Sequence, residues 1–268
     1  MKFIKMHGLS NDYVFADTFT QPCPKDPAAL SIEISKPHVG IGADGLILIE
    51  PCEGADARMR IFNADGSEAQ ICGNGLRCVG KYLYDTGLAR REELHIMTGA
   101  GMKHLTLTIE NGKAVAARAD MGEPQLIAVR KPLEICGRTI HFTCVSMGNP
   151  HAVTFEEEAG DGSFYVLGPA VEKHAFFPER TNVEFTRVES RDKLHVRVWE
   201  RGSGETMACG SGACGTLVAA VTEGLADRVA QVVLPGGALT IEWNEEDNHI
   251  YMTGPAEAVF SGEYPTED

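Results

Sequence analysis

Two cysteines stand at matching glycine-rich segments of the chain, and both segments suit a reactive thiol. Cys72 begins the run Cys-Gly-Asn-Gly, and Cys209 begins the run Cys-Gly-Ser-Gly. We expect each cysteine at the start of a helix, where unpartnered backbone N–H groups and the helix dipole favour an anion. A thiolate is favoured there too, so the sequence predicts that both thiol pKa values fall below the usual value of about 8.5. Because glycine lets the backbone approach a ligand closely, each segment is also predicted to cradle a carboxylate.

The two segments belong to an internal repeat. Residues 60–75 align with residues 197–212 without a gap, and the cysteines differ by 209 − 72 = 137 positions. The same offset relates Gly87-Leu-Ala to Gly224-Leu-Ala. A period this long indicates two homologous domains rather than a solenoid.

A pair of thiols on opposite faces of one carbon can invert that carbon. One sulfur, as thiolate, removes the proton, and the other, as thiol, donates a proton to the opposite face. Since each segment is predicted to cradle a carboxylate, the carbon in question lies α to a carboxylate. The repeat therefore predicts proton abstraction and return by Cys72 and Cys209, and it does not decide which thiol is ionised.

Each half of the repeat predicts the same arrangement of elements around its cysteine. Residues 76–86 and 213–223 lack proline and are rich in helix formers, and Gly87 and Gly224 follow where a helix ends in the left-handed conformation. Both helices are apolar on all sides and are predicted to be buried. Strand-like runs surround the helices at residues 45–50, 59–62, 94–97, 103–109, 194–199, 231–234 and 238–243, with a turn at residues 111–112.

The predicted fold class is α+β, with two pseudo-symmetric, duplicated domains. Each domain is expected to be a curved, mostly antiparallel sheet around one central helix, and the active site is expected in the cleft between the domains. The run Met121-Gly-Glu-Pro is predicted to interrupt regular structure near the boundary. We predict an N-terminal domain of residues 1–117, to which residues 255–268 return, and a C-terminal domain of residues 118–254.

Composition narrows the class of protein. The chain has 268 residues, a formal net charge of −14 and no run rich in lysine or arginine, which argues against nucleic acid and anionic membranes as partners. No segment is apolar over the roughly 18 residues that a membrane helix needs, and the N-terminus lacks the apolar stretch of a signal peptide. We therefore expect a cytoplasmic protein. The net charge does not exclude a small anionic ligand, because local backbone dipoles can oppose it.

The remaining cysteines are expected to be structural. The chain has 8 cysteines and no Cys-x-x-Cys pair, so no metal site is predicted. Small apolar packing is the expected role of Cys23, Cys52, Cys78, Cys136, Cys144 and Cys214. A disulfide between Cys72 and Cys209 would be an oxidised, inactive form. A thiol redox or metal-storage protein is a competing hypothesis, but it leaves the duplicated carboxylate cradle without a purpose.

Several motifs resemble those of the diaminopimelate epimerase family, and they run from residue 3 to residue 256. They are Phe3-Ile-Lys-Met-His-Gly-Leu-Ser-Asn-Asp-Tyr, Gly40-Ile-Gly-Ala-Asp-Gly, Phe62-Asn-Ala-Asp-Gly-Ser-Glu, Cys72-Gly-Asn-Gly-Leu-Arg-Cys, Gly148-Asn-Pro-His, Thr181-Asn-Val-Glu-Phe, Glu200-Arg-Gly-Ser-Gly-Glu-Thr-Met-Ala-Cys-Gly-Ser-Gly and Met252-Thr-Gly-Pro-Ala. The resemblance implies an isomerase without a cofactor that interconverts LL- and meso-2,6-diaminopimelate in lysine biosynthesis. It also implies a homodimer.

The resemblance assigns roles to residues of this chain. It implies that Cys72 and Cys209 are the catalytic cysteines and that His151 and Glu200 support catalysis at the reacting end. It implies that the segments Gly73-Asn74 and Gly210-Ser211 hold the reacting carboxylate. The further substrate-binding residues are Asn11, Asn63, Asn149, Asn182, Glu200 and Arg201, several of them at the distal, non-reacting centre. Asparagine suits an ammonium beside a carboxylate, and arginine can bind a carboxylate through two hydrogen bonds.

Two other racemases compete with this interpretation. A cofactor-independent racemase of the proline, hydroxyproline or histidine type would share the fold, but its substrate lacks a distal amino-acid group for Asn63, Asn182 and Arg201. A pyridoxal-phosphate racemase needs a Schiff-base lysine, and no lysine accompanies the glycine-rich segments.

Overall fold

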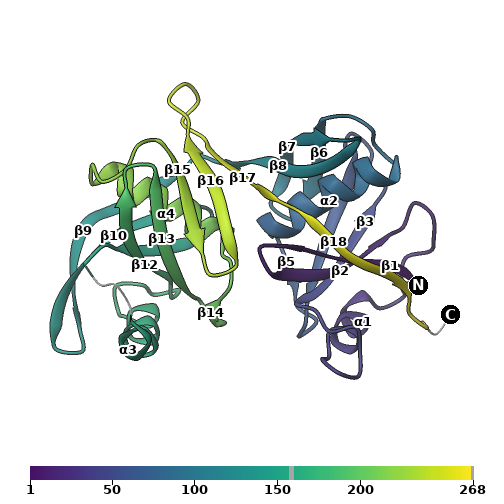
Figure 1. The fold of residues 1–268 in the computed structure, drawn as a ribbon. Coiled ribbons are helices and arrows are strands. Elements are labelled where there is room, and N and C mark those ends of the chain that lie inside the picture. The colour runs from purple at the N-terminus through teal and green to yellow at the C-terminus, as the bar shows by residue number, and fades with distance from the viewer. Residues whose placement is uncertain (157–159, 267–268) are drawn as a thin grey trace. The chain divides into compact units, whose positions relative to one another are not determined.

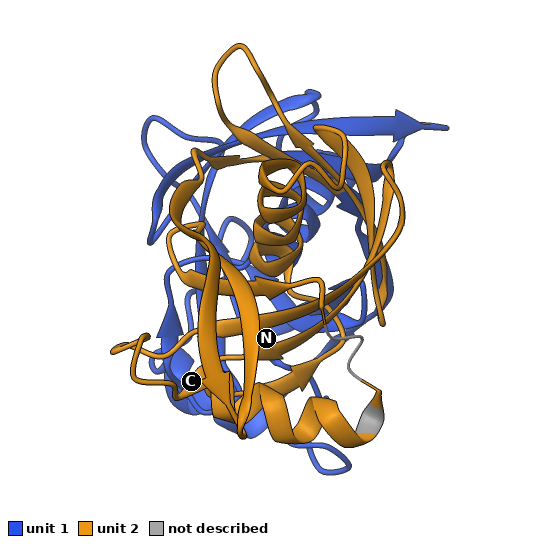
Figure 2. Cartoon of the chain, turned by 90° about the vertical axis from the view of Figure 1, so that its left-hand side faces the viewer, with its two compact units in different colours: residues 1–119, 254–268 blue, residues 120–253 orange. Residues whose placement is uncertain are grey.

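The computed structural model describes residues 1–156 and 160–266 (Figure 1). The chain forms two compact units, which Figure 2 shows in blue and orange. Unit 1 contains Met1–Ala119 and Gly254–Asp268, and unit 2 contains Asp120–Thr253. Residues 267 and 268, the end of the segment predicted to return to the N-terminal domain, lie outside the described residues.

Unit 1 is a mixed sheet with the helix α2 (Gly73–Thr86) packed against it. Its strands pair in the spatial order β18, β1, β2, β3, β4, β6, β7, β8, and the short β5 also pairs with β4. Neighbours are antiparallel except β2 with β3 and β4 with β6. The strands are β1 (Lys2–Gly8), β2 (Asn11–Asp17), β3 (Gly45–Glu50), β4 (Ala57–Asn63), β5 (Glu68–Ala69), β6 (Glu93–Thr98), β7 (Gly101–Glu110), β8 (Lys113–Gly122) and β18 (Glu257–Glu263).

Unit 2 has the same plan around the helix α4 (Gly210–Thr222), which Figure 2 shows encircled by strands. The spatial order is β9, β10, β11, β12, β13, β15, β16, β17, with the short β14 on β13. Its parallel pairs are β11 with β12 and β13 with β15. The strands are β9 (Gln125–Ile135), β10 (Arg138–Ser146), β11 (Pro150–Thr154), β12 (Asn182–Ser190), β13 (Lys193–Glu200), β14 (Gly204–Thr206), β15 (Val229–Leu234), β16 (Gly237–Trp243) and β17 (Ile250–Pro255).

The registers of strand pairing in the two units are related by the same offset as the sequence repeat. In unit 1 the first parallel pair aligns Val14 with Leu46, and in unit 2 it aligns Ala152 with Val183. The positions differ by 152 − 14 = 138 and 183 − 46 = 137, so the offset of the sequence repeat is kept to within one residue. The predicted α+β fold of two duplicated, mostly antiparallel domains with a central helix is confirmed.

The helix α4 is buried on all sides, as the sequence predicts. Every residue from Gly212 to Ala220 is buried. A helix without a polar face fits this position because strands surround it. Gly224, with φ of 74°, takes the left-handed conformation expected after the helix.

The helix α2 differs from its prediction, because it is not apolar all round. Leu76, Val79 and Leu83 are fully buried on one face, whereas Lys81 and Asp85 form an ion pair on a partly exposed face. Gly87 ends the helix with φ of 84°, as predicted. The polar face reflects a sheet that covers this helix incompletely, so the solvent side keeps charged residues.

The predicted interruption at residues 121–124 is wrong in part. The strand β8 continues through Met121 and Gly122, and Glu123 and Pro124 alone separate it from β9. A glycine with φ of 83° at position 122 turns the chain, and β9 begins directly after Pro124.

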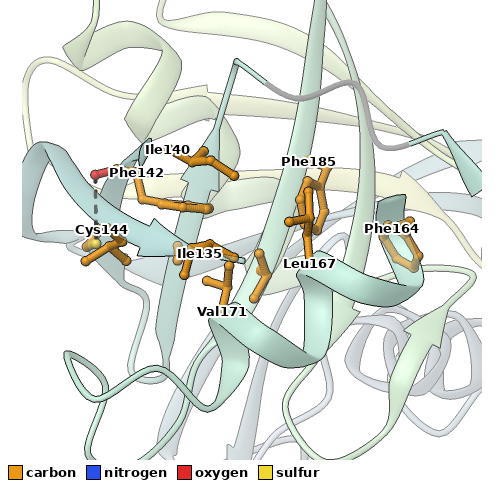
Figure 3. Packing of buried hydrophobic residues seen from close by; sticks show 11 residues of the cluster. Ile135, Ile140, Phe142, Cys144, Phe164, Leu167, Val171 and Phe185 are labelled. Atoms are coloured by element: carbon orange, nitrogen blue, oxygen red, sulfur yellow. Dashed lines mark hydrogen bonds between the residues drawn. The ribbon is translucent and has the colours of Figure 1, made fainter. Parts of the chain in front are cut away.

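Two further helices were not anticipated from the sequence. The helix α1 (Pro27–Ile34) follows Asp26, whose side chain accepts a hydrogen bond from the Ala29 N–H, and proline stands in its first turn. The helix α3 (Asp161–Glu172) packs Phe164, Leu167 and Val171 on apolar residues of β9, β10 and β12 (Figure 3). The capping aspartate before a proline is the signal that would have predicted α1.

None of the helices in the described part of the chain has the length and apolarity needed to span a membrane.

Candidate functional site

Both predicted catalytic cysteines are the N-cap residues of the central helices. Cys72 has an extended backbone (φ −138°, ψ 113°), and its sulfur accepts a hydrogen bond from the Gly75 N–H at 3.4 Å. Cys209 has nearly the same conformation (φ −117°, ψ 106°), and its sulfur accepts from the Gly212 N–H at 3.4 Å. The predicted helix-start position is confirmed for both thiols, and Gly73 and Gly210 are the first residues of α2 and α4.

Unit 1 holds Cys72 within a network of amides. The thiol donates to Asn11 Oδ1 at 3.3 Å, and the Asn74 amide donates to the same oxygen at 3.2 Å. Arg77, which is fully buried, donates from Nη2 to Asn74 Oδ1 at 2.7 Å. Asn11 and Asn74 are therefore fixed against Cys72, with a guanidinium behind them.

Asn63, the other predicted residue of unit 1, lies at the end of β4. Its amide donates to Ser67 Oγ at 3.0 Å, and its neighbour Ala64 donates from its N–H to the Asp44 carbonyl. The Asp44 carboxylate in turn accepts from the Asn11 amide at 2.7 Å. Asp44 thus links the end of β4 to the cysteine network.

Unit 2 builds a corresponding network around Cys209. The sulfur lies 3.7 Å from Ser211 Oγ, and the Asn149 amide donates to Ser211 Oγ at 3.3 Å. His151 Nε2 lies 3.1 Å from Asn149 Oδ1, and His151 Nδ1 lies 2.7 Å from a carboxylate oxygen of Glu184. Asn149, His151 and Ser211 are therefore brought together beside the start of α4.

The two networks follow the repeat. The pair Asn11 and Asn74 corresponds to Asn149 and Ser211, since 149 − 11 = 138 and 211 − 74 = 137. With the offset of 138 that applies to β2 and β11, Tyr13 corresponds to His151. Each unit therefore places an amide at the start of β2 or just before β11, and an aromatic residue with a polar tip two positions later.

Glu200, Asn182 and Arg201 lie together at the ends of strands in unit 2. Asn182 is buried, donates to the Pro150 carbonyl at 3.0 Å and accepts from the Arg201 N–H at 2.9 Å. The Arg201 guanidinium donates to the Glu179 carbonyl at 3.0 Å. Glu200 accepts a hydrogen bond from the Thr206 hydroxyl, and the charge of its carboxylate raises the pKa of the Cys209 thiol. The Asn182 amide therefore hydrogen-bonds to two backbone groups. One of them, the Arg201 N–H, lies at the start of the turn that follows β13.

The expectation that both thiols have lowered pKa values is wrong. Burial raises the pKa of the Cys72 thiol, and the Gly75 N–H, the Tyr13 hydroxyl and the Arg77 charge oppose that shift without cancelling it. Burial, then the carboxylates of Glu200 and Glu184, raise the pKa of Cys209 well above its usual value. Removal of the sulfur from water disfavours the thiolate more than one N–H and the helix dipole favour it.

Four residues of the site were not singled out from the sequence: Tyr13, Asp44, Arg77 and Glu184. A period-two pattern would have found two of them. Tyr13 lies two positions after Asn11, and Glu184 lies two positions after Asn182, so each shares a strand face with a predicted residue. The cysteine charge and burial raise the pKa of Tyr13, which marks its hydroxyl as a neighbour of the sulfur.

All 8 cysteines lie in the described residues and are free thiols. Among the described residues, no group of three or more His, Cys, Asp or Glu side chains is arranged to hold a metal ion. A cavity of about 630 Å³ in unit 2 is lined by Val221 and Gly224, so it lies at the end of α4 away from Cys209 and contains none of the predicted site residues.

The chain is similar to known proteins over almost its full length. A family model described as diaminopimelate epimerase matches residues 3–127 and 143–259. The diaminopimelate epimerase of Acetivibrio thermocellus is 49% identical over 98% of this chain and 98% of its own. That of Bacteroides thetaiotaomicron is 51% identical over 98% of this chain and 97% of its own.

Solved structures share the fold at low sequence identity. A hydroxyproline epimerase from Agrobacterium vitis, solved with bound trans-4-hydroxy-L-proline, has a TM-score of 0.70 at 14% identity and covers 98% of this chain and 90% of its own. A phenazine biosynthesis protein of the PhzF family from Bacillus anthracis has a TM-score of 0.72 at 16% identity and covers 99% of both chains. At these identities the similarity concerns the two-unit fold.

Proposed function

The chain belongs to the diaminopimelate epimerase family, and from that membership we propose that it interconverts LL- and meso-2,6-diaminopimelate without a cofactor. Membership makes the chain an isomerase. The proposed substrate is the one that the names of the relatives contain. The proposed reaction belongs to lysine biosynthesis. One observation carries the mechanism: both units present a cysteine as the N-cap of a glycine-rich helix, with a backbone N–H directed at the sulfur.

The proposed reaction uses the two thiols as acid and base on one α-carbon. One sulfur, as thiolate, takes the α-proton and becomes a thiol. The other gives its proton to the opposite face of the same carbon and becomes a thiolate, so the pair ends with the same net protonation. In the reverse direction the two sulfurs exchange roles. The proposal requires that Cys72 and Cys209 reach the same carbon from opposite sides.

The first turns of α2 and α4 suit the reacting carboxylate. Their N–H groups are the positive ends of the helix dipoles, and they would bind an anion whose α-carbon is losing a proton. The segments Gly73-Asn74 and Gly210-Ser211 supply these groups. Binding of the carboxylate there would also stabilise the charge that develops on it during proton abstraction.

The remaining residues are proposed to bind the substrate and to support the acid and base. His151 and Glu200 lie in unit 2 with Cys209 and are assigned to the reacting end. The substrate-binding residues of the proposal are Asn11, Asn63, Asn149, Asn182 and Arg201. Their amides and guanidinium match a distal ammonium and carboxylate, a group that proline or histidine lacks.

Isotope exchange tests the proposed reaction. The protein is incubated with LL-diaminopimelate in deuterated water, under reducing conditions and without added cofactor. We expect deuterium at one α-carbon and formation of the meso isomer, because the returned proton comes from a thiol that exchanges with solvent. Absence of exchange contradicts the proposal, and exchange with proline or histidine instead identifies the competing racemase.

Variants test the assignment of two bases. Changing Cys72 or Cys209 to alanine should abolish inversion in each case, because either loss leaves one face without an acid or base. Cys78→Ala is the matched control, since Cys78 is a cysteine close to Cys72 in sequence but lies buried in the body of α2. Full activity of either active-site variant would refute the assignment.

The homodimer expected for the family is part of the same proposal. Val259 and Phe260 of β18 are 54% and 47% exposed, and a second copy that covered them would remove apolar surface from water. Sedimentation equilibrium should give twice the mass of the chain, whereas a monomer at all concentrations would contradict the expectation.

A further inference from the structure

His151 and Glu184 form a fully buried pair in unit 2. The distance between His151 Nδ1 and Glu184 Oε1 is 2.7 Å, and both side chains have 0% exposure. Nε2 of the same ring lies 3.1 Å from Asn149 Oδ1. Each ring nitrogen of His151 therefore faces an oxygen atom. Nδ1 faces the carboxylate of Glu184, and Nε2 faces the amide oxygen of Asn149.

The Glu184 carboxylate is held at an energetic cost. Its second oxygen, Oε2, is buried and has no hydrogen-bond partner among the described residues. Burial of such an atom without a partner is unfavourable. The titratable groups around the carboxylate are Cys144 on β10, His151 on β11, Glu200 on β13 and Cys209 before α4, and His151 is the basic group among them.

Unit 1 shows that the fold does not need a carboxylate at this position. Glu184 corresponds to Ile47, since 184 − 47 = 137, and both meet the third residue of the helix. A Cβ added at Gly75 would lie 2.5 Å from Ile47 Cδ1, and one added at Gly212 would lie 2.8 Å from Glu184 Oε1. The same site in the duplicated sheet is thus filled by an apolar side chain in one unit and by a buried carboxyl group in the other.

Two glycines of the helix α4 leave space for the side chains of His151 and Glu184. Gly212 and Gly215 lie three positions apart and face Glu184 and His151, respectively, since a Cβ at Gly215 would lie 3.2 Å from His151 Cβ. The carboxylate consequently lies against the first turn of the helix, where the helix dipole favours a negative charge. The glycines therefore make room for a buried histidine–glutamate pair as well as for the approach of a ligand.

We propose that Glu184 is a positioning residue of the reaction, which fixes the orientation and the protonated nitrogen of His151. The inference rests on the proposed function, because it assigns a reason for the His151 geometry within that site. A carboxylate that accepts from Nδ1–H keeps the proton there and leaves Nε2 as the atom that gains and loses a proton. When Nε2 is protonated it donates to Asn149 Oδ1, and the carboxylate balances the positive charge of the ring.

Glu184→Gln is the variant that tests this role in the reaction. It keeps the shape and removes the charge, and we expect kcat to fall roughly 10- to 100-fold, less than the roughly 100- to 10,000-fold loss of an acid or base itself. KM should stay within about twofold, because the Glu184 side chain is fully buried and not open to a ligand. The pH profile of kcat should move towards lower pH, because the protonated ring loses its counter-charge. Glu184→Asp should recover part of the activity.

Glu223→Gln is the matched control. Glu223 is also a carboxylate of unit 2 with only 7% of its side chain exposed, and it accepts from Thr143 and Arg130 at the opposite end of α4. Its loss should lower the melting temperature and leave kcat and the pH profile unchanged. If both glutamine variants lose activity in parallel with stability, Glu184 is structural and the proposal is overturned.

The nitrogen shifts of His151 provide a readout that does not depend on catalysis. In protein labelled with ¹⁵N-histidine, the His151 resonances are assigned as those that are absent from His151→Asn. They should show a protonated Nδ1 in the parent protein and in Glu223→Gln. In Glu184→Gln the nitrogen shifts of His151 should change. An unprotonated Nδ1 in the parent would overturn the proposal even if Glu184→Gln does not fold. If the parent gives the expected shifts but no isotope exchange, the proposed function fails and the geometry of the pair stands.

Discussion

At the level of single residues, Cys72 and Cys209 share a backbone position and differ in the charges around them. The buried Arg77 and the Tyr13 hydroxyl favour a thiolate at Cys72. The carboxylates of Glu200 and Glu184 disfavour a thiolate at Cys209. Burial raises both pKa values, but the second is raised by charge as well. Of the two, Cys72 is the thiol that should ionise first as the pH rises.

This difference predicts the order in which the thiols react with iodoacetamide. The rate of alkylation follows the thiolate fraction, so a raised pKa moves the rate curve to higher pH. The midpoint for Cys72 should lie at lower pH than that for Cys209, and both should lie above pH 8.5. Mass spectrometry of the labelled peptides measures both midpoints in one sample, with the exposed Cys136 as reference. A lower midpoint for Cys209 would contradict the charge argument.

At the level of elements, the helices α2 and α4 use their internal glycines differently. In α2, a Cβ at Gly80 would meet the ends of two leucine side chains, Leu107 at 3.0 Å and Leu105 at 3.1 Å. In α4, a Cβ at Gly215 would meet His151 at Cβ and Cγ, at 3.2 and 3.3 Å. Leucine tips can move at small cost, whereas the base of the histidine moves together with the whole ring.

Substitution of these glycines by alanine should separate stability from activity. Alanine favours a helix by about 1 kcal/mol over glycine, so neither change need unfold the protein. Gly215→Ala should displace His151 by a few tenths of an ångström and lower kcat about tenfold, given that a shift of 1 Å can cost roughly 100-fold. Gly80→Ala should keep kcat within about twofold. Steady-state kinetics and melting temperatures check both, and equal activities would show that His151 tolerates the displacement.

At the level of the whole molecule, the end of the chain completes unit 1. The strand β18 pairs along β1, and Phe260 packs edge-on against Phe3 with a centroid distance of 5.8 Å. Arg77 donates from Nε to the Pro255 carbonyl at 3.2 Å, so the returning segment also contacts the residue behind Cys72. The sheet around Cys72 therefore depends on residues almost 200 positions along the chain from it, since 255 − 72 = 183.

A chain that ends after Ala256 should lose stability in unit 1 and not in unit 2. It keeps Pro255 but removes the β18 ladder, and several hydrogen bonds at roughly 1 kcal/mol each amount to about 2–4 kcal/mol. Hydrogen exchange should speed up in β1 and β2 and stay unchanged in β11 and β12. Phe260→Ala, which keeps the ladder, is the control and should have the smaller effect. Uniform loss of protection in both units would contradict a local role.

Much of the fold follows from the sequence because the repeat supplies a strong constraint. The offset of 137 residues, the glycine after each helix and the alternating run Leu194–Trp199 predict features that depend on local conformation and burial, and the structure has all of them. The helix α3 was not predicted because packing on the sheet, rather than a long periodic pattern, stabilises it. The helix α1 is shorter still, and its one local signal is the capping Asp26 before a proline. The polar face of α2 was missed for the same reason, since coverage by strands is not a local property.

The sequence by itself determined which residues stand at the two helix starts and that the two halves correspond. It did so because N-capping, glycine conformation and repeats depend on neighbours along the chain. Only the tertiary structure decided the electrostatics of the two thiols. Desolvation and the charges of Arg77, Glu184 and Glu200 act through space, and they raise pKa values that the local motif alone predicts to fall. The inequality of Cys72 and Cys209 therefore lies in the groups packed around them and not in the motif that they share.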